Sequence, residues 1–227
     1  MKFKLIENIN SKHFIFLYHG WGGTVNNNQN LIQMLNHLGY NIVLPELKFH
    51  DTRSPIDNYF DQTNMNNYFW ESIFSSIHEF DQLKTELNLE YENIIVAGIS
   101  MGGFISSGIL KKYPLIKGMI CINGSGSFLK SENIFRKNNN RKTLSDEEIN
   151  LFHSYDPILK TPYNNYILLM HGEIDKIVPI DGAKHFHNKQ IRSDALNTKF
   201  IIYENINHTV EDIMLHDILN WLKEVNE

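Results

Sequence analysis

Residues 98–102 have the residue types and the spacing of a serine nucleophile. They spell Gly-Ile-Ser-Met-Gly, directly after the apolar run 93–97 and directly before a helix-compatible segment. A strand-to-helix reversal that lifts a serine above a sheet is so tight that side chains at the two glycine positions would collide. Ser100 would also lie at a helix N-terminus, where the positive end of the dipole favours developing negative charge. The spacing therefore predicts that Ser100 is a nucleophile.

A serine hydroxyl needs partners, because it is a poor nucleophile until a base takes its proton and a carboxylate orients that base. At an elbow of this type the chain order is serine, acid, histidine. Two carboxylates, Glu173 and Asp175, follow the apolar run 166–170, and His208 follows the run 199–203. A competing histidine, His216, lies two turns into the last expected helix. The order predicts His208 as the base and leaves both carboxylates open as the acid.

A glycine-rich turn, Tyr-His-Gly-Trp-Gly-Gly at residues 18–23, follows the first strong apolar run. Such a turn lets a backbone N–H approach an acyl oxygen, and the amide after the nucleophile supplies a second donor. We expect the main-chain N–H groups of Trp21 and Met101 to form an oxyanion hole. Gly20 and Gly22 are expected to contribute to substrate binding in the same turn.

The apolar runs that must position these residues are rich in Ile, Val and Phe, and they are continuous rather than alternating. Strands that are buried on both faces require this pattern. We therefore expect an α/β fold, with a mostly parallel twisted sheet and helices on both faces. The expected strands are residues 14–18, 41–44, 93–97, 118–122, 166–170 and 199–203, and the expected helices are residues 28–38, 68–87, 101–112, 181–190 and 210–225.

About 40 residues, 124–165, separate the fourth and fifth expected strands, and a simple crossover needs fewer. Ser145 and Glu148 have the spacing of a capping box, which predicts a short helix from residue 145 to about residue 155. The preceding stretch 130–142 holds five cations and one anion. We expect a single domain, residues 1–227, in which 124–165 is a small mobile cap. We expect these cations and Arg53 to be solvated, the alternative being that they hold an anionic group of the substrate.

The composition excludes several classes of protein. The 227 residues are 42% hydrophobic and 21% charged, which is typical of soluble globular proteins and disfavours disorder. No apolar run approaches the ~18 residues of a membrane span, and the N-terminus lacks a signal peptide, so we expect a cytoplasmic protein. The net charge of −5 gives no footprint for nucleic acid. Cys121 is the single cysteine, so an internal disulfide and a cysteine-based metal site are excluded.

Together, four segments resemble the α/β-hydrolase family of serine esterases over nearly the whole chain. They are His19-Gly20-x-Gly22-Gly23, the elbow at 98–102, His171-Gly172-x-x-Asp175-x-x-Val178-Pro179, and the terminal His208. The compact length and the third segment look like small bacterial carboxylesterases related to the prolyl-oligopeptidase and dienelactone-hydrolase branches. Trp21 departs from the lipase type, which has three consecutive glycines in its turn.

The resemblance implies that Ser100 is the nucleophile, Asp175 the triad acid and His208 the base. It implies an α/β-hydrolase fold and an enzyme that cleaves small or short-to-medium acyl esters through an acyl-enzyme, with no cofactor and no metal. The partner would be a small-molecule ester. A thioesterase or peptidase of the same fold, and a non-catalytic ligand-binding protein, are the alternatives.

Other polar residues near these segments are given structural or surface roles. His19 and His171 look like structural histidines beside the site. His185 and His187 alternate along an expected helix without a metal-binding pattern, so we expect them on the surface. Residues 49–53 only loosely resemble the His-Gly-Glu-Arg loop of some relatives, and Arg53 within them is expected to be solvated.

Overall fold

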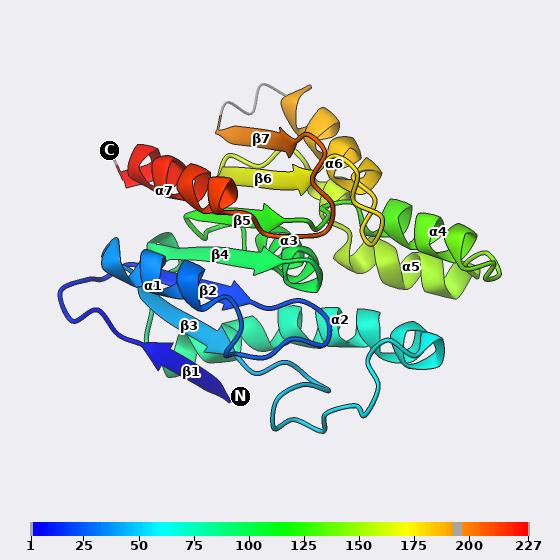
Figure 1. Ribbon diagram of the computed structural model, residues 1–227, viewed down its shortest axis with the longest axis horizontal. Helices are drawn as coiled ribbons and strands as arrows, with labels where there is room; N and C mark the ends of the chain where they lie inside the picture. The colour runs from blue at the N-terminus through cyan, green and yellow to red at the C-terminus, as the bar shows by residue number, and fades with distance from the viewer. Residues whose placement is uncertain (1, 193–196, 227) are drawn as a thin grey trace.

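A seven-stranded sheet forms the centre of the computed structural model, which describes residues 2–192 and 197–226 (Figure 1). The strand order is β1-β3-β2-β4-β5-β6-β7, with β1 antiparallel to β3 and every other neighbouring pair parallel. The prediction of a mostly parallel α/β sheet is confirmed. The strands are β1 (Phe3–Ile6), β2 (Phe14–Tyr18), β3 (Asn41–Pro45), β4 (Ile94–Ile99), β5 (Gly118–Ile122), β6 (Tyr166–Gly172) and β7 (Thr198–Tyr203).

Helices cover both faces of this sheet because successive strand side chains point to opposite sides. On β2, Phe16 and Tyr18 belong to one buried cluster, with apolar residues of α2 (Gln62–Glu86), α3 (Met101–Lys112) and α6 (Asp181–Ile191). Ile15 and Leu17 belong to the other, with α1 (Gln29–His37) and α7 (Asp212–Asn226). The continuous apolarity of the strands is therefore explained by burial on both faces.

Three elements differ from the expectation: β1, the start of α2, and α4 (Phe128–Asn138), which was expected as part of a cap but not as a helix. The edge strand β1 was not expected, and it pairs with β3 through only four residues. Helix α2 begins at Gln62 rather than at residue 68, because the Asp61 carboxylate accepts hydrogen bonds from the N–H groups of Thr63 and Asn64. The first turns of α2 are polar on most sides, so apolar periodicity alone did not indicate them.

The stretch 124–165 contains two helices, α4 (Phe128–Asn138) and α5 (Asp146–Tyr155), and a 3-10 turn, η2 (Pro157–Lys160). The capping box is present, with Ser145 Oγ accepting from the Glu148 N–H and the Glu148 carboxylate accepting from the Ser145 N–H. Figure 1 shows α4 and α5 projecting beyond the edge at which the parallel strands end. The single domain and the mobility of the cap stay predictions.

The remaining regular element is η1 (Tyr91–Asn93), directly before β4. None of the helices in residues 2–192 and 197–226 has the length and apolarity that a membrane span needs.

Candidate active site

Ser100 lies on a sharp turn between β4 and α3. Its φ of 57° and ψ of −117° place it in a region that costs a non-glycine residue about 1–3 kcal/mol. Its N–H donates to Ile122 O at 2.8 Å, which ties the turn to β5. A Cβ on Gly98 would lie 2.0 Å from Gly102 O, and a Cβ on Gly102 would lie 2.0 Å from Tyr18 O. The two glycines are therefore required by steric contact, as the sequence pattern predicts.

Replacing Gly98 with alanine should destabilise the fold by about 3 kcal/mol or more, because the clash is with backbone that cannot rotate away. Urea unfolding measures the loss. Gly39→Ala is the control for a glycine replacement without a clash: Gly39 has a positive φ, of 94°, which Gly98 does not, and nothing lies within 4 Å of an added Cβ. That variant should lose only about 1–2 kcal/mol. Equal losses at the two positions would contradict the steric argument.

Three side chains from distant parts of the chain form one hydrogen-bonded row. Ser100 Oγ lies 2.8 Å from His208 Nε2, and His208 Nδ1 lies 2.7 Å from Asp175 Oδ2. Ser100 follows β4, Asp175 follows β6 and His208 follows β7, so all three lie at the carboxyl edge of the sheet. A hydroxyl, an imidazole and a carboxylate in this order have the geometry of a nucleophile, a base and an orienting acid.

Hydrogen-bond donors surround the Asp175 carboxylate. Its Oδ1 accepts from the N–H groups of Ile177 and Val178, both at 2.9 Å, and His171 Nε2 lies 3.3 Å from its Oδ2. Burial opposes ionisation of this carboxyl, but the hydrogen bonds from His171 and His208 hold its pKa well below the usual range. Asp175 is therefore a carboxylate at neutral pH. His171 is buried and also donates to Val178 O at 2.8 Å.

The two competing residues lie elsewhere. Glu173 is exposed, and its carboxylate accepts from the Asn205 N–H at 3.4 Å. His216 is exposed on α7 and contacts Asn220 at 3.2 Å. The structure brings Asp175, and neither of these residues, to His208.

The glycine-rich turn packs directly on the elbow. A Cβ on Gly20 would lie 3.3 Å from Ser100 Cβ, so the next amide, that of Trp21, is close to the nucleophile. Met101 is the first residue of α3, and the first N–H groups of a helix have no partner within it. The oxyanion roles of Trp21 and Met101 and the substrate-binding role of Gly20 stay predictions.

His50 contacts the backbone of the glycine-rich turn 18–23, a role that the residue pattern did not predict. It is fully buried, its Nδ1 donates to Lys48 O at 2.9 Å, and its Nε2 accepts from the Gly22 N–H at 3.1 Å. The Gly22 amide is thus used within the protein, and the substrate-binding role of Gly22 stays a prediction. The position of His50 in the loop that follows the expected strand 41–44 was the available signal.

The neighbours of His50 complete the support. His19 is buried, with Nδ1 donating to Gly20 O at 2.8 Å and Nε2 lying 3.3 Å from Asp51 Oδ2. Asp51 in turn accepts from the Val25 N–H at 3.1 Å. His19 therefore contacts backbone and a buried carboxylate of the turn, as expected of a structural histidine.

Acid should loosen this turn through His50. Burial lowers the pKa of His50 to about 4, against 6.5 for the exposed side chain, so the unfolded chain binds more protons between these values. Stability is therefore expected to fall as the pH drops from about 6.5 to about 4, by up to about 3 kcal/mol from this group. Urea unfolding across this range, compared with His50→Gln, measures the effect. An unchanged acid dependence in that variant would contradict it.

The expectation of solvated arginines is wrong at three positions. Arg53 forms a two-pronged ion pair with Glu79, at 2.9 and 2.7 Å, and both side chains are partly buried. Arg136 and Arg141 both pair with the buried Glu132. The lysines of the same stretch are exposed, as expected: Lys130, Lys137 and Lys142.

The histidine pair on α6 differs by position. His185 is exposed as expected, whereas His187 is half-buried and packs against Phe200. Within residues 2–192 and 197–226, no group of three or more His, Cys, Asp or Glu side chains is placed to hold a metal ion.

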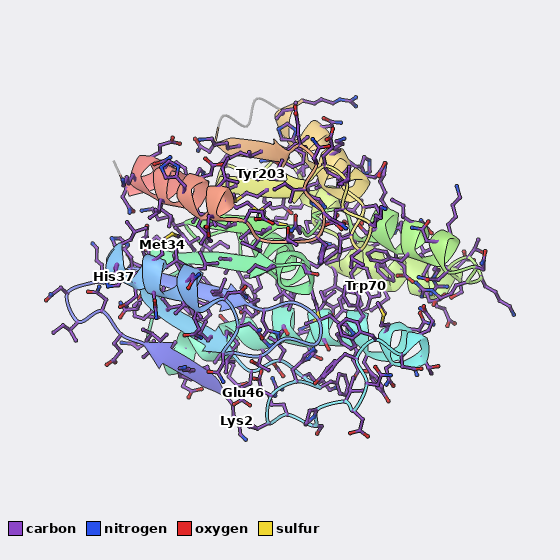
Figure 2. All side chains as sticks on the ribbon, in the orientation of Figure 1. Lys2, Met34, His37, Glu46, Trp70 and Tyr203 are labelled. Atoms are coloured by element: carbon purple, nitrogen blue, oxygen red, sulfur yellow. The ribbon has the colours of Figure 1, made fainter. Side chains whose placement is uncertain are left out.

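A cavity of about 420 Å³ opens beside Ser100 and His208, a size within the range of small-molecule sites. Its walls come from the first turns of α2, from α4 and the turn after it, and from the loop after β6. Figure 2 shows Trp70 where α2 meets α4 and α5. The lining side chains are mostly apolar or aromatic: Trp21, Phe60, Met65, Phe69, Trp70, Phe135, Ile177 and Val178.

Comparisons with known proteins agree with this architecture. The model of the prolyl oligopeptidase family matches residues 73–226. The chain is 23% identical over 234 residues to a Bacillus subtilis (strain 168) protein named "Putative esterase YitV", covering 92% of this chain and 88% of that protein.

Solved structures show the same fold. Esterase PE8 superposes with a TM-score of 0.69 at 17% identity, over 98% of this chain and 97% of its own. Est1E from Butyrivibrio proteoclasticus, solved with ferulic acid bound, superposes with a TM-score of 0.71 at 15% identity, over 99% and 95% of the two chains. Because the family match spans more than half of the chain, the protein belongs to the prolyl oligopeptidase family, with an α/β-hydrolase fold.

Proposed function

We propose that the protein is a serine carboxylesterase that cleaves small or short-to-medium acyl esters. The observation that carries this proposal is the row from Ser100 Oγ through His208 to Asp175 at the mouth of an apolar cavity. The names of the B. subtilis relative and of the structural neighbours PE8 and Est1E support an esterase over other hydrolases.

In the proposed reaction, His208 Nε2 takes the hydroxyl proton of Ser100 as Oγ attacks the ester carbonyl. The N–H groups of Trp21 and Met101 hold the resulting oxyanion. The tetrahedral intermediate then collapses, the C–O bond to the alcohol breaks, and His208 returns the proton to the departing alkoxide. An acyl group is left on Ser100 Oγ.

The acyl-enzyme is hydrolysed by the same groups, with water in place of the serine hydroxyl as the nucleophile. His208 takes a proton from water, the hydroxide attacks the acyl carbonyl, and collapse releases the acid as the proton returns to Ser100. Asp175 accepts a hydrogen bond from the Nδ1–H of His208. This bond fixes the tautomer in which Nε2 can accept the serine proton, and the carboxylate stabilises the imidazolium that forms in both steps.

The cavity volume supports compact substrates. About 420 Å³ holds a short or medium acyl chain, and the aromatic lining favours apolar groups in it. The stretch 124–165 contributes only two short helices and a turn, which is too little to enclose a long lipid.

Matched ester, thioester and amide substrates with one acyl group test the reaction type. We expect the ester to give the highest kcat/KM and the amide the lowest, because alkoxide leaves more readily than amine. Faster thioester turnover would identify a thioesterase, and faster amide turnover would identify a peptidase. Folded protein that hydrolyses none of the three over an acyl-length series would favour a non-catalytic binding protein.

A further inference from the structure

Charged side chains line the same cavity as Ser100. Glu132, only 2% exposed, is fully engaged: its Oε2 accepts from Trp70 Nε1 at 2.7 Å, and its Oε1 accepts from Arg136 Nε at 2.7 Å and from Arg141 Nη1 at 3.0 Å. Two guanidinium groups and an indole N–H thus neutralise this carboxylate. Glu132 and Arg141 line the cavity, whereas Arg136 does not.

Arg136 and Arg141 differ in how many of their N–H groups have partners. Arg136 donates from all three nitrogens, to Glu132, to Lys142 O at 3.0 Å and to Glu148 at 2.5 Å, so it joins α4 to α5. Arg141 Nη1 to Glu132 is the only hydrogen bond of the Arg141 side chain to a described residue, and its Nε is buried without a partner. A guanidinium N–H that is buried and unpaired is costly. Arg141 therefore has unused donors beside a cavity that already contains the nucleophile.

The surroundings of Arg141 favour an anion. Among the described residues that line the cavity it is the single Lys or Arg, and its only acidic companion there, Glu132, is already neutralised. The stretch 130–142 carries five cations and one anion. A guanidinium edge also matches the two oxygens of a carboxylate.

We propose that Arg141 binds a carboxylate carried by the substrate on the part remote from the scissile ester. This inference rests on the proposed esterase function and narrows its substrate class to esters with an anionic tail. The aromatic walls formed by Phe69, Trp70 and Phe135 would hold the apolar body between the two ends. The amides of Asn66 and Asn139, which also line the cavity, would face its polar groups.

Two chromogenic esters of equal length test the proposal: mono-4-nitrophenyl adipate and 4-nitrophenyl hexanoate, which differ in a terminal carboxylate against a methyl group. Wild type should prefer the adipate ester by about tenfold or more in kcat/KM. Arg141→Met should lower the ratio of the two kcat/KM values by about 10- to 100-fold, the effect of removing a hydrogen bond to a charged group. Glutarate and pimelate half-esters show which length fits.

Lys137→Met is the matched control. It removes the same charge from α4, but Lys137 is exposed and does not line this cavity. It should leave the ratio within about twofold, because an exposed charge outside the cavity is screened. Arg141→Lys, which keeps the charge and loses the planar fork, should give an intermediate ratio. Thermal unfolding of each variant identifies any loss of fold. Equal ratios in Arg141→Met and Lys137→Met would exclude a carboxylate on the acyl half.

A second arm places the carboxylate on the alcohol half, using acetate esters of ω-hydroxyalkanoic acids against acetate esters of plain alkanols. A preference that depends on Arg141 in either arm supports the subsite and identifies the half that carries the anion. If neither arm shows a preference that depends on Arg141, the anion subsite is overturned, even where the neutral esters are hydrolysed and the esterase function stands.

Binding separates the two proposals if hydrolysis fails. Calorimetric titration of Ser100→Ala with monomethyl adipate and with methyl hexanoate, which differ only in the remote carboxylate, measures the subsite without turnover. Tighter binding of the adipate half-ester, lost in Ser100→Ala combined with Arg141→Met, would support the anion site even if no ester is cleaved. Equal, Arg141-independent binding would overturn the site.

Discussion

Replacing Ser100 with alanine should lower kcat for ester hydrolysis by about a million-fold, because no other group in the row with His208 and Asp175 can form the acyl-enzyme. A fluorophosphonate probe should label wild type at Ser100 and leave the variant unlabelled. Chromogenic ester turnover gives the rate.

The variant should fold normally, because alanine keeps the backbone N–H that donates to Ile122 O. Ser154→Ala is the control: Ser154 is exposed on α5, and its hydroxyl donates to Leu151 O, at 2.6 Å. It should keep wild-type activity and labelling. If folded Ser100→Ala keeps more than a hundredth of the wild-type rate, the assignment of Ser100 as the nucleophile is contradicted.

Replacing Asp175 with asparagine should lower kcat by about 10⁴-fold. Every partner of this carboxylate is a donor: the N–H groups of Ile177 and Val178, and the rings of His171 and His208. An asparagine amide would place an NH₂ donor against these N–H donors. It would also favour the His208 tautomer in which Nε2 carries the hydrogen, and that nitrogen cannot accept the serine proton. Steady-state kinetics on one ester measures the loss.

Glu173→Gln is the matched control for this change. The two carboxyl groups lie two residues apart in one loop, but Glu173 is exposed and its carboxylate accepts from the Asn205 N–H. Its loss should alter kcat by less than about twofold, as for a surface side chain away from the chemistry. A large effect at Glu173 together with a small one at Asp175 would reverse the assignment of the acid.

Much of the candidate site was predictable because its signals are local. The elbow at 98–102 is encoded by a tight turn in which a Cβ on Gly98 would meet Gly102 O, and the second glycine is required by the neighbouring strand β2, through Tyr18 O. The order of serine, acid and histidine follows from the chain itself. Continuous apolar runs predicted six of the seven strands, because burial on both faces leaves no room for polar alternation.

The tertiary structure decided what depends on residues far apart in the chain. Glu173 and Asp175 are equivalent by residue type and nearly so by position, and only the packing of the loop after β6 turns one of them toward His208. The helix start at Gln62 depends on a polar cap rather than on apolar spacing.

The same holds for the polar contacts behind and across the cavity. His50 reaches Gly22 across 28 residues, and Trp70 reaches Glu132 across 62. Residue types and spacing predict the sheet, the elbow and the order of the reactive residues, because apolar periodicity and the tight turn at Gly98 act between near neighbours. The tertiary structure alone decided which arginine is paired and which has donors left for a ligand, because such pairing depends on how α2, α4 and the turn after α4 come together in space.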